Sequence, residues 1–320
     1  MIQSLIGPLK SWISNRPTVG WVLLLILFAL IPPFVGSYFR YVINLAIIFI
    51  IASYGMNILV GTNQVSIGNA AFFAIGAYTS ALFVQELGVP FLGALLAAGV
   101  FAAIIGLIIG LPVIRLEDIY LGIATMGFVL ICEQVLISWS GLTNGANGLT
   151  VTKASLGGWP LNTDLKFFYF LFPVAIASIV IGRNISKTRT GRAFAALKMS
   201  PIAAQAMGIN VARYKAISFI LSAFFTGISG SLFAHYVGFI DPPTFGIFLS
   251  ISFVSMVVIG GIGTIAGSIL GALFVTILPE ILVVLGAKDA QRVVYGISMI
   301  LILRFLPQGL QGLLGRGSGK

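Results

Sequence analysis

Residues 89–112 read VPFLGALLAAGVFAAIIGLIIGLP, a run of 24 residues that contains no charged side chain. About 20 consecutive apolar residues are enough for a helix to cross the hydrocarbon core of a bilayer. The whole chain has the same character, because its 320 residues are 58% hydrophobic and only 8% charged. Soluble domains carry about 25% charged residues. The sequence therefore predicts an all-α, polytopic transmembrane helical bundle, in which helices satisfy every backbone polar group internally.

Hydropathy places about ten spans along the chain, which we expect to form a single transmembrane domain over residues 1–320. The eighth and tenth spans are short, and one of them could be re-entrant. We expect the first to be a retained span and not a signal peptide, because Pro32-Pro33 follows it without a small-x-small cleavage site. The expected spans are 19–36, 41–60, 64–84, 89–112, 119–138, 167–182, 216–236, 246–260, 267–285 and 292–306.

The net charge of +10 indicates topology and not nucleic-acid binding, because the basic residues are few and scattered. Lys and Arg mark the cytoplasmic side of membrane proteins. Placing the N-terminus in the cytoplasm puts 13 of the 18 basic residues inside. This orientation makes 139–166 the main external loop and 183–215 the main cytoplasmic loop.

Catalysis and metal binding find no support in the sequence. The chain has one cysteine, Cys132, and one histidine, His235, which we expect near the external end of its span at the interface. It lacks the phosphate-binding G-x-x-x-x-G-K-[ST] motif. We therefore expect no metal, no cofactor and no enzymatic activity. If this protein moves a solute with ATP, the ATPase is another chain.

The cytoplasmic loop contains a short predicted helix. Residues 190–215 read TGRAFAALKMSPIAAQAMGINVARYK, where Ser200 followed by Pro201 indicates a helix start and Gly208 indicates its end. A helix of about two turns is unstable alone, so it needs a surface to pack on. A groove on another protein fits, and the alternative is a helix lying on lipid. One side of it would carry Ile202, Ala203 and Met207.

Two further segments and one acid are candidates for a solute pathway. Polar Gln64, Ser66 and Asn69 start the third span, either as helix–helix contacts or as a broken helix that lines a route. Five glycines within 260–271 predict a break or tight turn, followed by close packing along Gly267 and Gly271. The pathway candidates in that segment are Gly260, Gly261 and Gly263. Glu133 lies within a span, where a carboxylate needs a partner, water or a proton.

The sequence Ala203-Ala204-x-x-x-Gly208 resembles the end of the E-A-A-x-x-x-G loop of ABC importer permeases. Residues 64–78 and 191–215, together with 147–150, 234–236, 260–264 and 278–280, resemble the permeases of high-affinity branched-chain amino acid importers. This resemblance implies a permease subunit that works by alternating access. It also implies that the loop contacts an ATPase. The residues implied in that contact are Arg192, Ser200, Pro201, Ile202, Ala203, Ala204, Met207 and Gly208.

The resemblance also implies partners and a location. The partners are a second homologous permease chain, two cytoplasmic ATPase subunits that bind ATP, an external solute-binding protein and membrane lipid, all at the plasma (inner) membrane. The chain departs from the pattern at Ile202, where the motif has an acid, and at Asn69, where many relatives have histidine. Open alternatives are an ion-coupled secondary amino acid transporter, a urea or amide ABC permease, and a channel or structural subunit.

Overall fold

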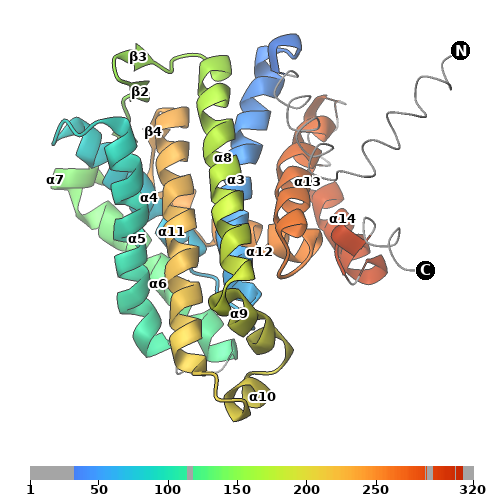
Figure 1. The fold of residues 1–320 in the computed structure, drawn as a ribbon. Helices are drawn as coiled ribbons and strands as arrows, with labels where there is room; N and C mark the ends of the chain where they lie inside the picture. The colour runs from blue at the N-terminus through green and yellow to red at the C-terminus, as the bar shows by residue number, and fades with distance from the viewer. Residues whose placement is uncertain (1–31, 114–117, 285, 287–290, 307, 313–320) are drawn as a thin grey trace, which may run out of the picture.

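The computed structural model of the chain describes residues 32–113, 118–284, 286, 291–306 and 308–312 (Figure 1). Most of these residues are helical and very few lie in strands, which confirms the all-α polytopic prediction. The α-helices are α3 (Ser37–Val60), α4 (Asn69–Gln85), α5 (Phe91–Val113), α6 (Asp118–Ser138), α7 (Ser140–Thr143), α8 (Asp164–Lys187), α9 (Arg189–Met199), α10 (Pro201–Ala206), α11 (Val211–Val237), α12 (Ile247–Gly260), α13 (Ile265–Val284) and α14 (Gln291–Phe305). Short 3₁₀ turns lie at Pro32–Phe34, Gly145–Asn147 and Pro242–Phe245.

Seven segments within the described residues are long and apolar enough to cross a membrane. Each of the second to tenth predicted spans contains a helix, although α4 has only 17 residues and α14 only 15. The first predicted span, 19–36, lies mostly outside the described residues. The count of ten spans therefore stays a prediction, as does the side on which the N-terminus lies.

Helices α3 and α11 form the centre of the bundle. Most residues of both are buried, whereas a third or less of the residues of α5, α6, α8 and α13 are buried. Helix α11 packs against α3, α4 and α5, and α13 packs against α3 and α12. The loop before α8 and the helices α9 and α10 lie at opposite ends of the bundle (Figure 1), as the predicted alternation of the spans requires.

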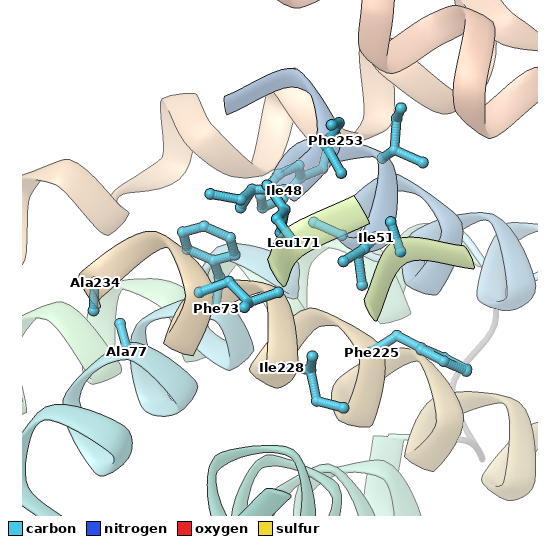
Figure 2. Close-up of a cluster of buried hydrophobic side chains, with 14 of the residues drawn as sticks. Ile48, Ile51, Phe73, Ala77, Leu171, Phe225, Ile228, Ala234 and Phe253 are labelled. Carbon is cyan, nitrogen blue, oxygen red and sulfur yellow. The ribbon is translucent and has the colours of Figure 1, made fainter. Parts of the chain in front are cut away.

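Aromatic and branched side chains fill the core between these helices (Figure 2). Phe73 of α4 lies at its centre, with ring centroids 5.3 Å from Phe233 and 5.4 Å from Phe253. Ile48 and Ile51 of α3 are almost completely buried beside it. One interior thus joins helices that are far apart in sequence.

Glycines bring α4 and α11 into backbone contact. A Cβ atom at Gly76 would lie 2.0 Å from the Gly227 carbonyl oxygen, and one at Gly230 would lie 1.9 Å from the Phe73 carbonyl oxygen. Such close approach is possible only without side chains, and small residues are the usual means of helix association in lipid. These glycines therefore determine how closely the two helices pack.

The predicted break at the glycine-rich segment is confirmed between α12 and α13. Gly261 and Gly263 have φ angles of +128° and +75°, in the region that favours glycine. The predicted close packing is also present, because a Cβ at Gly271 would lie 1.7 Å from the Met256 carbonyl oxygen. The segment is a tight turn between two closely packed helices.

The end of the bundle opposite α9 and α10 contains two short antiparallel strand pairs that no sequence pattern predicted. The described strands are β1 (Leu149–Thr150), β2 (Ser155–Leu156), β3 (Trp159–Pro160) and β4 (Phe239–Ile240). Strand β1 pairs antiparallel with β4, directly after α11, and β2 pairs with β3. The loop 139–166 is therefore attached to the end of α11.

His235 lies near the end of its span, as expected, because α11 ends at Val237, but its side chain is covered by protein. His235 is 1% exposed, with Nε2 3.0 Å from Ser80 Oγ and Nδ1 2.8 Å from the Thr152 carbonyl oxygen. Ser231 donates to the same Ser80 hydroxyl at 2.7 Å. Because the 139–166 loop folds back over the end of α11, the imidazole is covered and links that loop to α4.

Candidate functional site

The predicted loop helix is α10. Ser200 caps its start, because the Ser200 hydroxyl oxygen accepts a hydrogen bond from the Ala203 amide at 3.2 Å. Pro201 occupies the first turn, where the missing proline N–H costs nothing. Gly208 follows the end of the helix with a φ of +82°, which glycine adopts without strain. The predicted start and end of this helix are confirmed.

The apolar side chains of α10 lie outside the bundle. Ile202 and Met207 are each 83% exposed, and Met199 at the end of α9 is 86% exposed. Ala203 is exposed as well, whereas Ala204 is buried against the rest of the chain. Exposed apolar side chains gathered at one tip indicate a surface that another molecule covers.

Helix α9, which sequence patterns did not predict, anchors that tip to the bundle. Thr188 caps it by accepting a hydrogen bond from the Gly191 amide at 3.5 Å. Gly191 and Leu197 are buried, so one side of α9 packs on the bundle. Arg192 is exposed on the other side and donates to the Lys187 carbonyl oxygen at 3.4 Å. The Thr188 cap was the available signal for this helix.

The predicted polar cluster before α4 is buried against α11. Gln64 Nε2 donates to Ser218 Oγ at 2.7 Å. Asn69 Nδ2 donates to Ser222 Oγ and to Thr226 Oγ1, each at 3.1 Å. We call this contact the polar seam and define it by the fully or almost fully buried residues Gln64, Ser66, Asn69, Ser218, Ser222 and Thr226.

The polar seam matches the expected helix–helix contact, whereas the lining of a solute route stays a prediction. Residues 61–68 are not helical, and Asn63 has a φ of +58°, so α4 starts later than predicted. The side chains bind α11 of the same chain, as helix–helix contacts do. Gln64 Oε1 and Asn69 Oδ1 are buried and make no hydrogen bond to the described residues. A buried acceptor usually has a partner, so these two atoms distinguish the seam from a fully paired helix–helix contact.

The turn between α12 and α13 is held by Asn57 of α3. Asn57 Nδ2 donates to the Thr264 carbonyl oxygen and to Ser268 Oγ, each at 2.7 Å. Asn57 Oδ1 accepts a hydrogen bond from the Gly263 amide. Among the glycine candidates, Gly260 and Gly261 are buried and Gly263 is exposed.

Replacing Asn57 with leucine is expected to destabilise the chain, because the buried Ser268 hydroxyl and the part-buried backbone groups at Gly263 and Thr264 would lose their partner. Each unsatisfied buried group costs about 1–3 kcal/mol. Thermal unfolding of the detergent-purified chain measures the loss. The matched control is Asn184→Leu, at an exposed position of α8. Equal unfolding temperatures for the two variants would contradict this role of Asn57.

Glu133 of α6 is half-buried, and its carboxylate lies close to Gly246 at the start of α12. It makes no ion pair or hydrogen bond with any described residue. Neighbouring Gln134 is exposed and donates to Ser138 Oγ at 3.3 Å. Both residues line a shallow depression of about 390 Å³ with Leu130 and Ile137. The structure does not bring Glu133 together with the polar seam.

No three histidine, cysteine or acidic side chains gather into a possible metal site anywhere in the described part of the chain. The bundle of long apolar helices, with its buried polar seam and its exposed loop helix, is typical of a multi-pass membrane protein.

Comparison with known proteins agrees with this class. The family described as the permease component of the branched-chain amino acid transport system matches residues 38–303. The high-affinity branched-chain amino acid transport system permease protein LivM of Escherichia coli K12 is 33% identical over 294 residues, covering 83% of this chain and 68% of LivM. The probable branched-chain amino acid transport permease protein LivH of Methanocaldococcus jannaschii is 28% identical, covering 78% of this chain and 84% of LivH.

A third relative carries a different description. The autoinducer 2 import system permease protein LsrC of Enterobacter sp. 638 is 25% identical, covering 86% of this chain and 81% of LsrC. No solved structure matches this chain significantly. The chain belongs to the family of branched-chain amino acid transport system permease components. It is therefore a multi-pass protein of the inner membrane, in a family of transport permeases and not of enzymes.

Proposed function

We propose that this chain is the transmembrane permease subunit of an ABC importer that moves branched-chain amino acids by alternating access. The observation that supports this most is α10, whose exposed Ile202 and Met207 form an apolar tip on a helix anchored by α9. Two separate ATPase subunits bind and hydrolyse ATP, and this chain needs no cofactor. Its ten spans place the N-terminus and the 183–215 loop in the cytoplasm.

The contact with the ATPase is formed by α10 and its flanks. An ATPase groove covers Ile202, Ala203 and Met207, while Ser200, Pro201 and Gly208 fix the shape of the helix. Ala204 packs it on the bundle, and exposed Arg192 lies beside the contact. Because Ile202 replaces the acid of the usual motif, the contact with the ATPase depends on burial of apolar side chains and not on an ion pair.

A second homologous permease chain covers the outer side of α6. This side exposes Ile123, Leu130 and Ile131, which lipid would accept, but also Gln134 and part of Glu133. A carboxylate within the hydrocarbon region costs about 2.5–3.5 kcal/mol or more when lipid surrounds it. A protein–protein boundary with a hydrated solute route removes that cost.

The route itself includes the polar seam and the glycine turn. Gln64, Ser66 and Asn69 supply polar groups beside α11, and Glu133 supplies a charge at the boundary. Gly260, Gly261 and Gly263 let α12 and α13 change their relative position. The external loop, 139–166, receives a solute-binding protein that delivers the amino acid.

The experiment that tests this proposal purifies the full assembly in nanodiscs and measures ATP hydrolysis. Binding protein loaded with leucine, isoleucine or valine should stimulate hydrolysis, and omission of either permease should abolish the stimulation. Binding protein loaded with urea or an amide is the comparison. If only the binding protein loaded with urea or an amide stimulated hydrolysis, the substrate would be urea or an amide and not a branched-chain amino acid. Failure of the chain to co-purify with any ATPase would contradict the proposal.

A further inference from the structure

A second site of a different kind lies at the end of the bundle that carries α9 and α10 (Figure 1). There, a cavity of about 360 Å³ opens between α3, α8, α9 and the turn after α12. Ligand pockets in proteins have volumes of about 300–1,000 Å³, so this cavity is large enough for a small organic molecule. It includes none of the polar seam and none of α10.

The cavity has one positive group with free hydrogen-bond donors. The Lys198 ammonium of α9 donates one hydrogen bond, to the Ile262 carbonyl oxygen at 2.9 Å. Lys198 is exposed and an ammonium group has three donors, so two remain for solvent or a ligand. No acidic side chain among the described residues forms an ion pair with it, and no acidic side chain lines the cavity.

A hydroxyl group lies in the same cavity without a partner. Tyr54 of α3 is 6% exposed, and its hydroxyl oxygen lies against Gly182, which also lines the cavity. Within the described part of the chain, this hydroxyl makes no hydrogen bond. A tyrosine hydroxyl can donate one hydrogen bond, so this one is available to a ligand in the cavity.

The remaining walls are largely apolar. Ile58 of α3, Ile185 of α8, Phe194 of α9 and Ile265 of α13 all line the cavity. A ligand that matches this lining has one negative group for Lys198 and Tyr54 and a short hydrocarbon tail for the walls. It needs no positive group, because none of the described residues that line the cavity has a carboxylate.

We propose that this cavity binds a small aliphatic monocarboxylate and that the bound molecule fixes α9 to α3. Lys198 and Tyr54 come from these two helices, so one carboxylate held by both would join them. Because α9 carries α10, occupancy would slow any movement of the loop helix. This effect on transport rests on the function proposed above, whereas the binding itself does not.

The test uses 4-methylpentanoate and the purified full chain in a non-ionic detergent, with binding measured by isothermal titration calorimetry. We expect saturable binding to one site. The neutral isostere 4-methylpentanamide should bind at least about tenfold more weakly, because a hydrogen-bonded charge is lost. Equal binding of the acid and the amide would overturn the proposal.

Two variants locate the site. Lys198→Gln can keep the hydrogen bond to Ile262 but loses the charge, and we expect it to weaken binding about tenfold. Tyr54→Phe removes only the hydroxyl and should also weaken binding. The matched control is Arg189→Gln, which removes a charge from the same helix outside the cavity and should bind as the native chain does. Unchanged binding by Lys198→Gln would overturn the proposal.

A lipid headgroup is the competing source of a negative group. The titration is therefore repeated in nanodiscs of phosphatidylcholine, with and without phosphatidylglycerol. We expect the carboxylate affinity to be the same in both. Loss of binding when phosphatidylglycerol is present would mean that the site belongs to a lipid and would overturn the proposal. Because these readouts need no ATPase, they can fail while the proposed transport function stands, and the reverse also holds.

Discussion

Replacing Gly76 with leucine is expected to prevent the native packing of α4 on α11. A Cβ at this position would lie 2.0 Å from the Gly227 carbonyl oxygen and 2.5 Å from Gly227 Cα. Overpacking of an interior costs about 1–3 kcal/mol when side chains can move aside. Here the obstacle is backbone, which cannot rotate away, so we expect a cost at or above the top of that range. Thermal unfolding and size-exclusion chromatography of the detergent-purified chain measure the effect.

The matched control for this variant is Gly127→Leu. Gly127 lies within α6, as Gly76 lies within α4, but a Cβ at Gly127 would meet no atom within 4 Å. Both variants exchange a helical glycine for leucine, so the difference between them isolates the contact with α11. If Gly76→Leu were as stable as Gly127→Leu, the close approach of α4 and α11 would be wrong.

The second large effect is expected from the double variant Ile202→Arg and Met207→Arg. Both side chains are 83% exposed, so the chain itself should fold as before. In the assembled importer, two arginines would enter an apolar groove without partners, and an unpaired buried charge costs several kcal/mol. We therefore expect ATP-driven uptake to fall by more than about tenfold. Uptake of radiolabelled leucine into proteoliposomes measures this change.

The control for this variant is Asn184→Arg. It adds a charge at an exposed position near the end of α8 that leads into α9. It should leave uptake and assembly unchanged. Co-purification of the ATPase separates the causes, because the double variant should lose the ATPase while its unfolding temperature stays native. Native uptake by the double variant would show that α10 lies on lipid and not on an ATPase.

The loop helix could be predicted because its signals are local. Ser200, Pro201 and Gly208 each favour one backbone conformation through their own side chain or its absence. The turn at Gly261 and Gly263 follows from the same physics. Hydropathy located the long spans for a similar reason. Each span is one continuous segment, and its apolar composition matches the lipid around it.

The features that could not be predicted depend on contacts between distant segments. The burial of His235 requires the 139–166 loop to fold back onto α11, which no pattern near His235 encodes. The partners of Asn69 lie about 150 residues away, at Ser222 and Thr226. Composition identified Asn69 as notable but could not decide between a contact and a route lining, because both place a polar side chain inside the membrane.

The central claim is that energy for transport comes from ATP hydrolysed by other subunits that contact α10. Leucine accumulation in proteoliposomes tests it most directly, with either an ion gradient or ATP and the binding protein as the energy source. We predict accumulation only when the second permease, the ATPase subunits, the binding protein and ATP are all present. Accumulation by this chain alone under a proton or sodium gradient would contradict the account.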